Sequence, residues 1–110
     1  MDSQLTQRYA LKFHDVFPPV SSFRLAPIGE KYKLLGYNMK QHEDKQVPIL
    51  KVMDEKNIIE FKYAPKALRP YCDQQTEEEI YSQNKFIEVL FKGQSDVKME
   101  FEFIRVGSLK

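Results

Sequence analysis

Apolar and polar residues alternate with a period of two along much of the chain, which is typical of β-strands with one buried face. The pattern predicts strands over residues 31–39, 47–53, 58–63, 86–91 and 97–106. The last is the clearest, because from Val97 to Phe103 the odd positions are apolar and the even positions are charged. We therefore expect a mainly β protein.

The same alternation assigns side chains to the two faces of the second and third strands. A polar turn over residues 54–57 separates these strands, and Asp54 and Asn57 tolerate the backbone angles that short turns require. We expect the core to receive Leu50, Val52, Ile59, Phe61 and Tyr63. The outward set is then Ile49, Lys51, Met53, Ile58, Glu60 and Lys62.

Gly36 lies in the middle of the first predicted strand. A glycine weakens a strand unless the chain bends sharply there or another backbone comes close. We expect Gly36 to permit a bend of the kind found at the corners of β-barrels; the alternative is an incidental glycine in a loop. The polar run over residues 40–46 predicts the next loop.

A short helix is predicted between the third and fourth strands. Thr76 followed by Glu79 fits a capping box, so this helix should begin at Glu77. The run 86–91 has two interpretations, because it could continue the helix to a Gly93 cap or form a strand. Its β-branched and aromatic residues favour the strand.

The first 30 residues have no single interpretation. Tyr9, Leu11 and Phe13 alternate as in a strand, whereas Leu5, Tyr9 and Phe13 are spaced as on one helix face. Residues 20–30 read as a connection, which we expect to be held on the domain by Phe23, Leu25 and Ile28.

Length and composition predict one folded domain. With 110 residues, 42% hydrophobic and 30% charged, the chain is large enough for a single core. We expect residues 1–30 to be an extension packed on a domain formed by residues 31–106. No apolar run is long enough to span a membrane, the first 20 residues carry charges where a secretory signal needs an apolar block, and a single cysteine forms no internal disulfide. These features predict an intracellular location.

No catalytic or metal-binding pattern is present in the sequence. His14, His42 and Cys72 are far apart, whereas metal sites need three or four ligands at short spacings. The four glycines are scattered, and the adjacent carboxylates are typical of turns and helix caps. We therefore expect no enzyme activity, no cofactor and no metal.

Charge is divided unevenly along the chain. Residues 1–71 contain twelve Lys and Arg against eight Asp and Glu, which is a net charge of +4. Residues 72–110 contain five Lys and Arg against eight Asp and Glu, which is a net charge of −3. A dedicated nucleic-acid binder usually concentrates positive charge more strongly than this.

Three segments carry a resemblance to a known superfamily: Tyr32 to Tyr37, Ile49 to Asp54 and Ile58 to Tyr63. Together with the order of three strands, a helix and two strands, they resemble the OB-fold. The pattern is similar in outline to the smallest subunits of replication protein A and of the telomeric CST complex. It departs from the former because no long helix follows the last predicted strand. The resemblance implies a five-stranded Greek-key barrel with one short helix.

The resemblance also implies a role in binding. Small OB subunits dock onto a larger OB-fold protein in complexes on single-stranded DNA or RNA. These complexes act in telomere maintenance or replication, and the small subunit makes only an auxiliary contact with the nucleic acid. A eukaryotic protein of this type would be nuclear and would form a heterodimer. The alternative from a different class is a β-rich inhibitor or adaptor, for example viral, that acts by protein contact only.

An OB barrel binds a single strand across its second and third strands and between its first and fourth loops. The outward set above has no aromatic ring, so a tyrosine of the first strand would have to stack on the bases. The corresponding nucleic-acid candidates are Tyr37, Lys40, His42, Lys45, Lys51, Lys62, Lys92 and Lys98. The candidates for partner docking are the apolar residues Tyr9, Leu11, Phe13, Phe17, Ile49, Met53 and Ile58.

Overall fold

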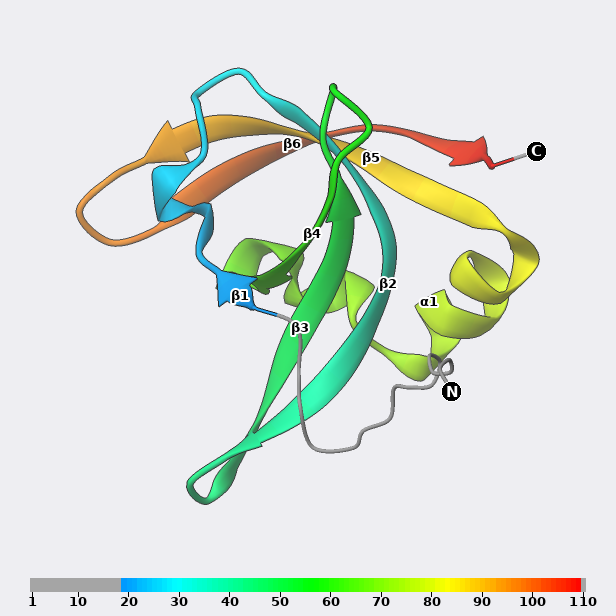
Figure 1. Cartoon of the computed structure of the whole chain (residues 1–110), viewed down its shortest axis with the longest axis horizontal. Helices are drawn as coiled ribbons and strands as arrows, with labels where there is room; N and C mark the ends of the chain where they lie inside the picture. The colour runs from blue at the N-terminus through cyan, green and yellow to red at the C-terminus, as the bar shows by residue number, and fades with distance from the viewer. Residues whose placement is uncertain (1–18, 110) are drawn as a thin grey trace, which may run out of the picture.

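The computed structural model describes residues 19–109 and is mainly β (Figure 1). Its strands are β1 (Val20–Ser21), β2 (Lys31–His42), β3 (Lys45–Met53), β4 (Ile59–Tyr63), β5 (Lys85–Gln94) and β6 (Met99–Ser108). Its helical segments are η1 (Phe23–Leu25), η2 (Lys66–Tyr71), α1 (Gln74–Glu79) and η3 (Tyr81–Gln83). The expected succession of three strands, a short helix and two strands is confirmed, and β1 is an addition to it.

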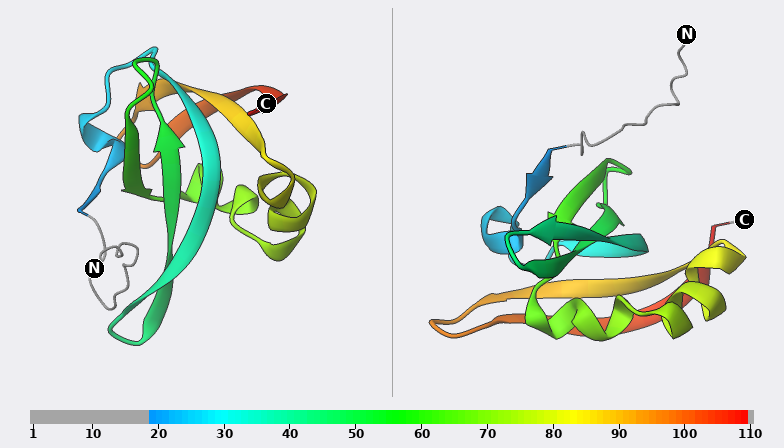
Figure 2. Two further views of the ribbon diagram at one scale, coloured as in Figure 1. Left: turned by 45° about the vertical axis from the view of Figure 1, so that its right-hand side comes forward. Right: turned by 90° about the horizontal axis from the view of Figure 1, so that it is seen from below.

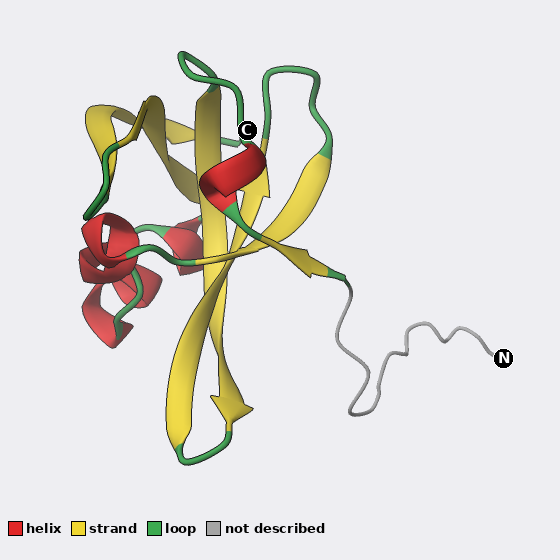
Figure 3. Ribbon diagram, turned by 90° about the vertical axis from the view of Figure 1, so that its left-hand side faces the viewer, coloured by secondary structure: helices red, strands yellow, loops and turns green. Residues whose placement is uncertain are grey.

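The six strands form one mixed sheet in the order β1-β4-β3-β2-β5-β6. β1 is parallel to β4, and the other neighbouring pairs are antiparallel. The sheet is curled, so that β5 and β6 form a second layer behind β2, β3 and β4 (Figure 2). Helical segments η2, α1 and η3 are grouped on one side of the sheet, apart from η1 (Figure 3), and η2 contacts β6.

The sheet is not closed into a barrel, contrary to the expectation of a closed five-stranded one. Closure would require β4 to pair with β6, which lies at the opposite end of the strand order. β4 pairs with β3 along one edge, and on the other edge Phe61 and Lys62 pair with β1. β1 was not expected, because two residues in a connecting segment leave no periodic pattern.

The core contains side chains from both layers of the curled sheet. Phe23 of η1 is 1% exposed, and its ring centroid lies 5.1 Å from those of Tyr32 and of Phe101. The expected anchoring of residues 20–30 by Phe23 is therefore confirmed. Leu25 and Ile28, which we expected beside it, are 88% and 75% exposed.

The turn between β3 and β4 has five residues, 54–58, rather than four. The Asp54 N–H donates to the Ile58 carbonyl at 3.0 Å. The Asp54 carboxylate oxygen Oδ1 accepts hydrogen bonds from the N–H groups of Lys56, at 2.8 Å, and Ile58, at 3.0 Å. Asn57 has a φ of 65°, a conformation that asparagine tolerates well. These bonds set the register of the hairpin.

This register reverses the predicted faces of β4. Ile59 pairs with Met53, Phe61 with Lys51, and Tyr63 with Ile49. Directly paired residues of antiparallel strands lie on the same face, so the assignment of these β4 side chains to the core was wrong. Ile59 and Tyr63 are 45% and 40% exposed.

Lys62 consequently points to the inner side of the sheet, where it is 5% exposed. Its ammonium nitrogen Nζ donates to Ser21 Oγ at 3.0 Å and lies 3.0 Å from a carboxylate oxygen of Glu60. The ammonium also lies 5.4 Å from the centroid of the Phe23 ring. The outward position expected for Lys62 was wrong, and this side chain instead links β4 to β1 and η1.

Gly36 follows a β-bulge, because the pairing of β2 with β3 shifts between Leu34 and Gly36. Its φ is not positive, and a Cβ atom built there would have no heavy atom within 4 Å. The strand therefore bends at this point, but the bend does not depend on the missing side chain as we had expected. At Gly107, in contrast, a Cβ atom would lie 2.3 Å from Cζ of Phe86.

Other boundaries differ locally from the sequence prediction. β2 and β3 extend through most of the expected loop 40–46 and leave Glu43 and Asp44 as the turn. Helix α1 begins at Gln74, because the Asp73 side chain accepts from the Thr76 N–H at 2.8 Å and caps it. The preferred interpretation of residues 86–91 as a strand is confirmed by β5. Of the residues expected in the last strand, Val97 precedes β6 and is 87% exposed, and Phe103 is 52% exposed, so neither is buried as expected.

Alanine at the two glycines should have opposite results. Gly107→Ala should lower the free energy of unfolding by about 1–3 kcal/mol, because the new methyl group overlaps the buried Phe86 ring. Gly36→Ala should leave it unchanged or raise it by up to about 1 kcal/mol, because its site is open and glycine is a poor strand residue. Urea unfolding measures both, and a large loss with Gly36→Ala would contradict the geometry.

Removal of the Asp54 side chain tests the turn that sets the register. Asp54→Ala should lower the free energy of unfolding by about 1–2 kcal/mol, because two backbone N–H groups lose their acceptor. Glu55→Ala, at the exposed neighbouring position, is the matched control and should change it by less than about 0.5 kcal/mol. Equal losses in the two variants would show that the Asp54 carboxylate does not hold the turn.

Candidate nucleic-acid interface

One side of the three strands β2, β3 and β4 carries the side chains that could meet a ligand. Pairing in both hairpins identifies its members, because paired residues share a face. We call this set the outer face; it consists of Lys33, Gly36, Asn38, Lys40, His42, Lys45, Val47, Ile49, Lys51, Met53, Ile59, Phe61 and Tyr63. None of these described residues is Asp or Glu, so the formal charge of the set is positive.

The structure brings together four of the predicted nucleic-acid candidates on the outer face: Lys40, His42, Lys45 and Lys51. His42 and Lys45 pair directly at the tip of the β2–β3 hairpin. Lys51 is exposed and lies between Gly36 and Phe61 in the register of the three strands. A single strand that follows this face would therefore meet cations along its length.

Aromatic rings lie among these cations, and the sequence analysis did not find them. Phe61 is half-buried beside Lys51, and Tyr63 lies nearer to the hairpin tip. The Lys40 ammonium is 5.9 Å from the centroid of the Tyr63 ring, a distance at which a cation is attracted to the ring. Both rings had been assigned to the core, because alternation does not tell which of two faces is buried.

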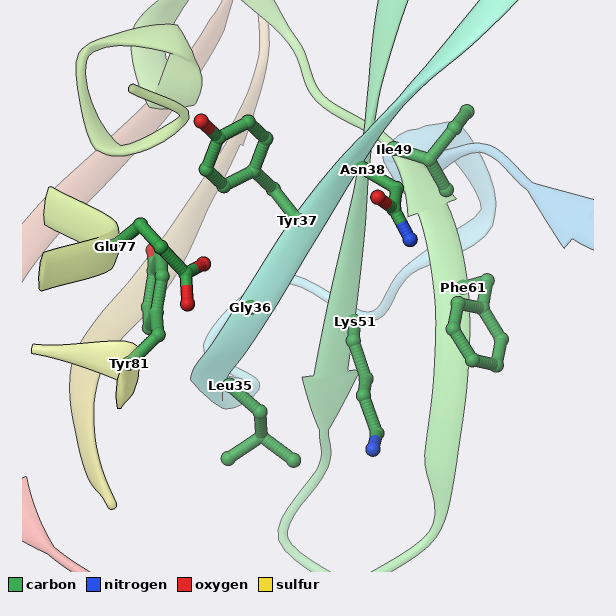
Figure 4. A pocket seen from close by; sticks show the side chains of 9 residues that line it. All are labelled: Leu35, Gly36, Tyr37, Asn38, Ile49, Lys51, Phe61, Glu77 and Tyr81. Atoms are coloured by element: carbon green, nitrogen blue, oxygen red, sulfur yellow. The ribbon is translucent and has the colours of Figure 1, made fainter. Parts of the chain in front are cut away.

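A pocket of about 320 Å³ lies at the end of the outer face near α1 and η3 (Figure 4). Its walls include Gly36, Tyr37, Asn38, Lys51, Phe61, Glu77 and Tyr81. Figure 4 shows Lys51 and Phe61 projecting from adjacent strands, with Glu77 and Tyr81 entering from the helical side. The pocket therefore joins a cationic and aromatic wall to a wall that carries one carboxylate.

The two tyrosines of this pocket are uncharged. The centroids of the Tyr37 and Tyr81 rings are 6.4 Å apart. Burial, and secondarily the negative charge of Glu77, raise the pKa of Tyr37. Burial also raises the pKa of Tyr81, whose hydroxyl donates to the Tyr71 carbonyl at 2.9 Å. Both hydroxyls therefore stay protonated at physiological pH, and both rings are uncharged.

The remaining nucleic-acid candidates lie elsewhere. Lys62 is on the inner side of the sheet and is buried. Lys92 is exposed on β5, and Lys98 precedes β6 and lies 3.7 Å from a carboxylate oxygen of Glu100. Lys98 lines a different pocket, together with Arg24 and Lys66. These three lysines do not extend the outer face.

The partner-docking candidates divide into three groups. Ile49 belongs to the outer face but is only 1% exposed, so the exposed position expected for it was wrong. Met53 is half-buried and Ile58 is 50% exposed, both at the β3–β4 turn. The other four, Tyr9, Leu11, Phe13 and Phe17, lie outside the described residues.

Cys72 is in a protected position between η2 and α1. Its thiol points to the Leu68 carbonyl, with 3.7 Å between sulfur and oxygen. Burial, and secondarily the charge of Asp73, raise the pKa of the Cys72 thiol to about 12. The thiolate that nucleophilic catalysis requires is therefore scarce at neutral pH.

Within residues 19–109, no group of three or more His, Cys, Asp or Glu is placed to hold a metal ion. The same part of the chain contains no helix with the length and apolar character of a membrane span.

Comparisons of the chain with protein-family models, with curated proteins and with solved structures gave no match.

Cys72 should react slowly with a thiol reagent such as dithionitrobenzoate. The thiolate is the reactive form of cysteine. The raised pKa keeps the Cys72 thiol protonated to higher pH in the folded protein than in the unfolded chain. At about pH 8 we expect reaction in urea to be much faster than in buffer, and the native rate to be still rising at about pH 10. A native rate that levels off near pH 8 or 9 would contradict this assignment.

Proposed function

We propose that this protein is a non-catalytic, OB-like subunit that binds single-stranded nucleic acid across its outer face. The OB-fold is a partly open Greek-key barrel, and its second and third strands form the usual ligand face. The strands that correspond to them here are β3 and β4. The order of strands and the helix before β5 support this comparison, and the open edge is compatible with it.

The observation that carries the proposal is the combination of Lys51, Phe61 and Tyr63 on one face whose own strand residues include no carboxylate. Aromatic rings bind unpaired bases by stacking, which contributes about 1–3 kcal/mol per base. Lysines bind the phosphates, and each neutralised phosphate makes binding more sensitive to salt. Lys40 beside Tyr63 and Lys45 at the hairpin tip continue this arrangement along β2 and β3.

We further propose that the protein acts with a larger OB-fold protein in a complex on single-stranded DNA or RNA. The formal net charge of +1 favours an auxiliary nucleic-acid contact over tight independent binding. Met53 and Ile58, with the 45% exposed Ile59 beside them, provide an apolar end of the β3–β4 hairpin for docking. In a eukaryotic cell this role would place the protein in the nucleus, in telomere or replication complexes.

The second candidate is an inhibitor or adaptor that acts through protein contact only. It is favoured by Leu25 and Val97, which are 88% and 87% exposed on segments away from the outer face. Contiguous exposed apolar patches mark contact surfaces, so this candidate requires Leu25 and Val97 to belong to such patches. The two candidates differ in one measurable property, which is binding to a single strand.

Charge reversal at Lys51 tests the first candidate. The protein should bind a fluorescently labelled single-stranded oligonucleotide at low salt, with affinity that falls as salt is raised. Lys51→Glu should weaken binding by at least about fivefold, because it removes one phosphate contact and adds a repulsive charge. Fluorescence anisotropy at several salt concentrations measures both effects.

The matched control is Lys85→Glu, which makes the same charge change at an exposed position of β5. We expect it to weaken affinity by less than about twofold, and only through the change in net charge of the protein. Equal weakening by the two variants would show binding by overall charge and not by the outer face. Failure of the natural protein to bind any single strand would favour the adaptor.

A further inference from the structure

We propose that the pocket beside α1 receives one base of the bound strand and that Glu77 selects bases that carry an exocyclic amino group. This inference rests on the proposed function, because it concerns which part of a single strand enters the pocket. The bases in question are cytosine, adenine and guanine, in contrast to uracil and thymine.

Glu77 is half-buried, and its carboxylate is directed into the pocket (Figure 4). One carboxylate oxygen, Oε2, accepts a hydrogen bond from Ser82 Oγ at 2.8 Å. Among residues 19–109, no hydrogen bond to the other oxygen, Oε1, is formed. The carboxylate is thus held by one oxygen and can accept a hydrogen bond from a ligand with the other.

The short helix that carries Glu77 is fixed at its beginning. Asp73 accepts from the Thr76 N–H through its side chain at 2.8 Å and from the Glu77 N–H through its carbonyl at 3.0 Å. The backbone of Glu77 is therefore anchored directly. A carboxylate held in this way can discriminate between ligands by hydrogen bonding, because it does not have to be ordered when the ligand binds.

The opposite side of the pocket leaves room for a flat ring. Gly36 contributes no side chain, and a Cβ atom built there would meet no heavy atom within 4 Å. The aromatic rings of Tyr37, Tyr81 and Phe61 belong to the lining. A volume of about 320 Å³ is at the lower end of the usual range for small-molecule sites, about 300–1,000 Å³.

Charge determines which part of a nucleotide can face Glu77. A phosphate would be repelled by the carboxylate, whereas the cationic side of the pocket, at Lys51, attracts it. The group at Glu77 must therefore be a hydrogen-bond donor, and the donors of a base are its ring N–H and its exocyclic amino group. Cytosine presents an amino group at position 4, where uracil presents a carbonyl oxygen that the carboxylate repels. The one ring donor of uracil, N3–H, lies between two carbonyl oxygens, so a carboxylate that approaches it is repelled on both sides.

Strands of deoxycytidine and deoxyuridine provide the sharpest test, because the two bases have nearly the same size and shape. We expect the natural protein to bind oligo(dC) about tenfold more tightly than oligo(dU), as one hydrogen bond to a charged acceptor predicts. In Glu77→Gln this ratio should fall to less than about threefold. The amide oxygen of glutamine can accept from the amino group of cytosine, and its NH2 group can donate to the carbonyl oxygen of uracil. Competition by unlabelled strands, read by fluorescence anisotropy, measures the ratio.

Two control variants separate the selection by Glu77 from other effects. Glu78→Gln makes the same charge change on the same helix outside the pocket, and should leave the ratio unchanged. Ser82→Ala removes the hydrogen bond that holds the carboxylate and should lower the ratio partly. Equal binding of oligo(dC) and oligo(dU) by the natural protein would overturn the inference and leave the proposed function intact. Absence of binding to both strands would overturn the two together.

Discussion

The length of the turn between β3 and β4 is the constraint on which the arrangement of this protein depends. Because Met53 pairs with Ile59 across a turn of five residues, Leu50 and Val52 share the inner side with Lys62, and Lys51 shares the outer side with Phe61. A turn with one residue fewer would exchange the two faces of β4. The composition of the core, the link to β1 and the composition of the outer face are all consequences of this register.

Periodicity predicted the long strands well and their orientation less well. β5 and β6 were located by alternation and by β-branched and aromatic residues, which are local properties of the chain. Alternation separates Phe61 from Lys62, but it does not tell which of them faces the core. That choice depends on hydrogen bonds of Asp54 to the backbone of the turn, for which the sequence shows only a polar run.

Long-range features were the least predictable. The cationic members of the outer face, such as Lys40 in an expected loop and Lys51 in an expected strand, were found because charge is visible in the sequence. The sheet contains an additional edge strand of two residues, Val20 and Ser21, which pairs with β4 and has no periodic signal. The pocket joins Gly36 to Glu77, residues far apart in the sequence, and Glu77 was predicted only as the first residue of a helix.

The unequal edges of the sheet have a consequence for self-association. One edge is β1, with two residues, and the other is β6, with ten. Growth of fibrils by strand addition would therefore start at β6, where the partly exposed Phe103 offers an apolar contact. The pairing of β6 with β5 is irregular after Phe103, and Glu100, Glu102 and Arg105 alternate with its apolar residues. Irregularity and charge are the means by which natural sheets resist such growth, so this edge combines an aggregation hazard with its own protection.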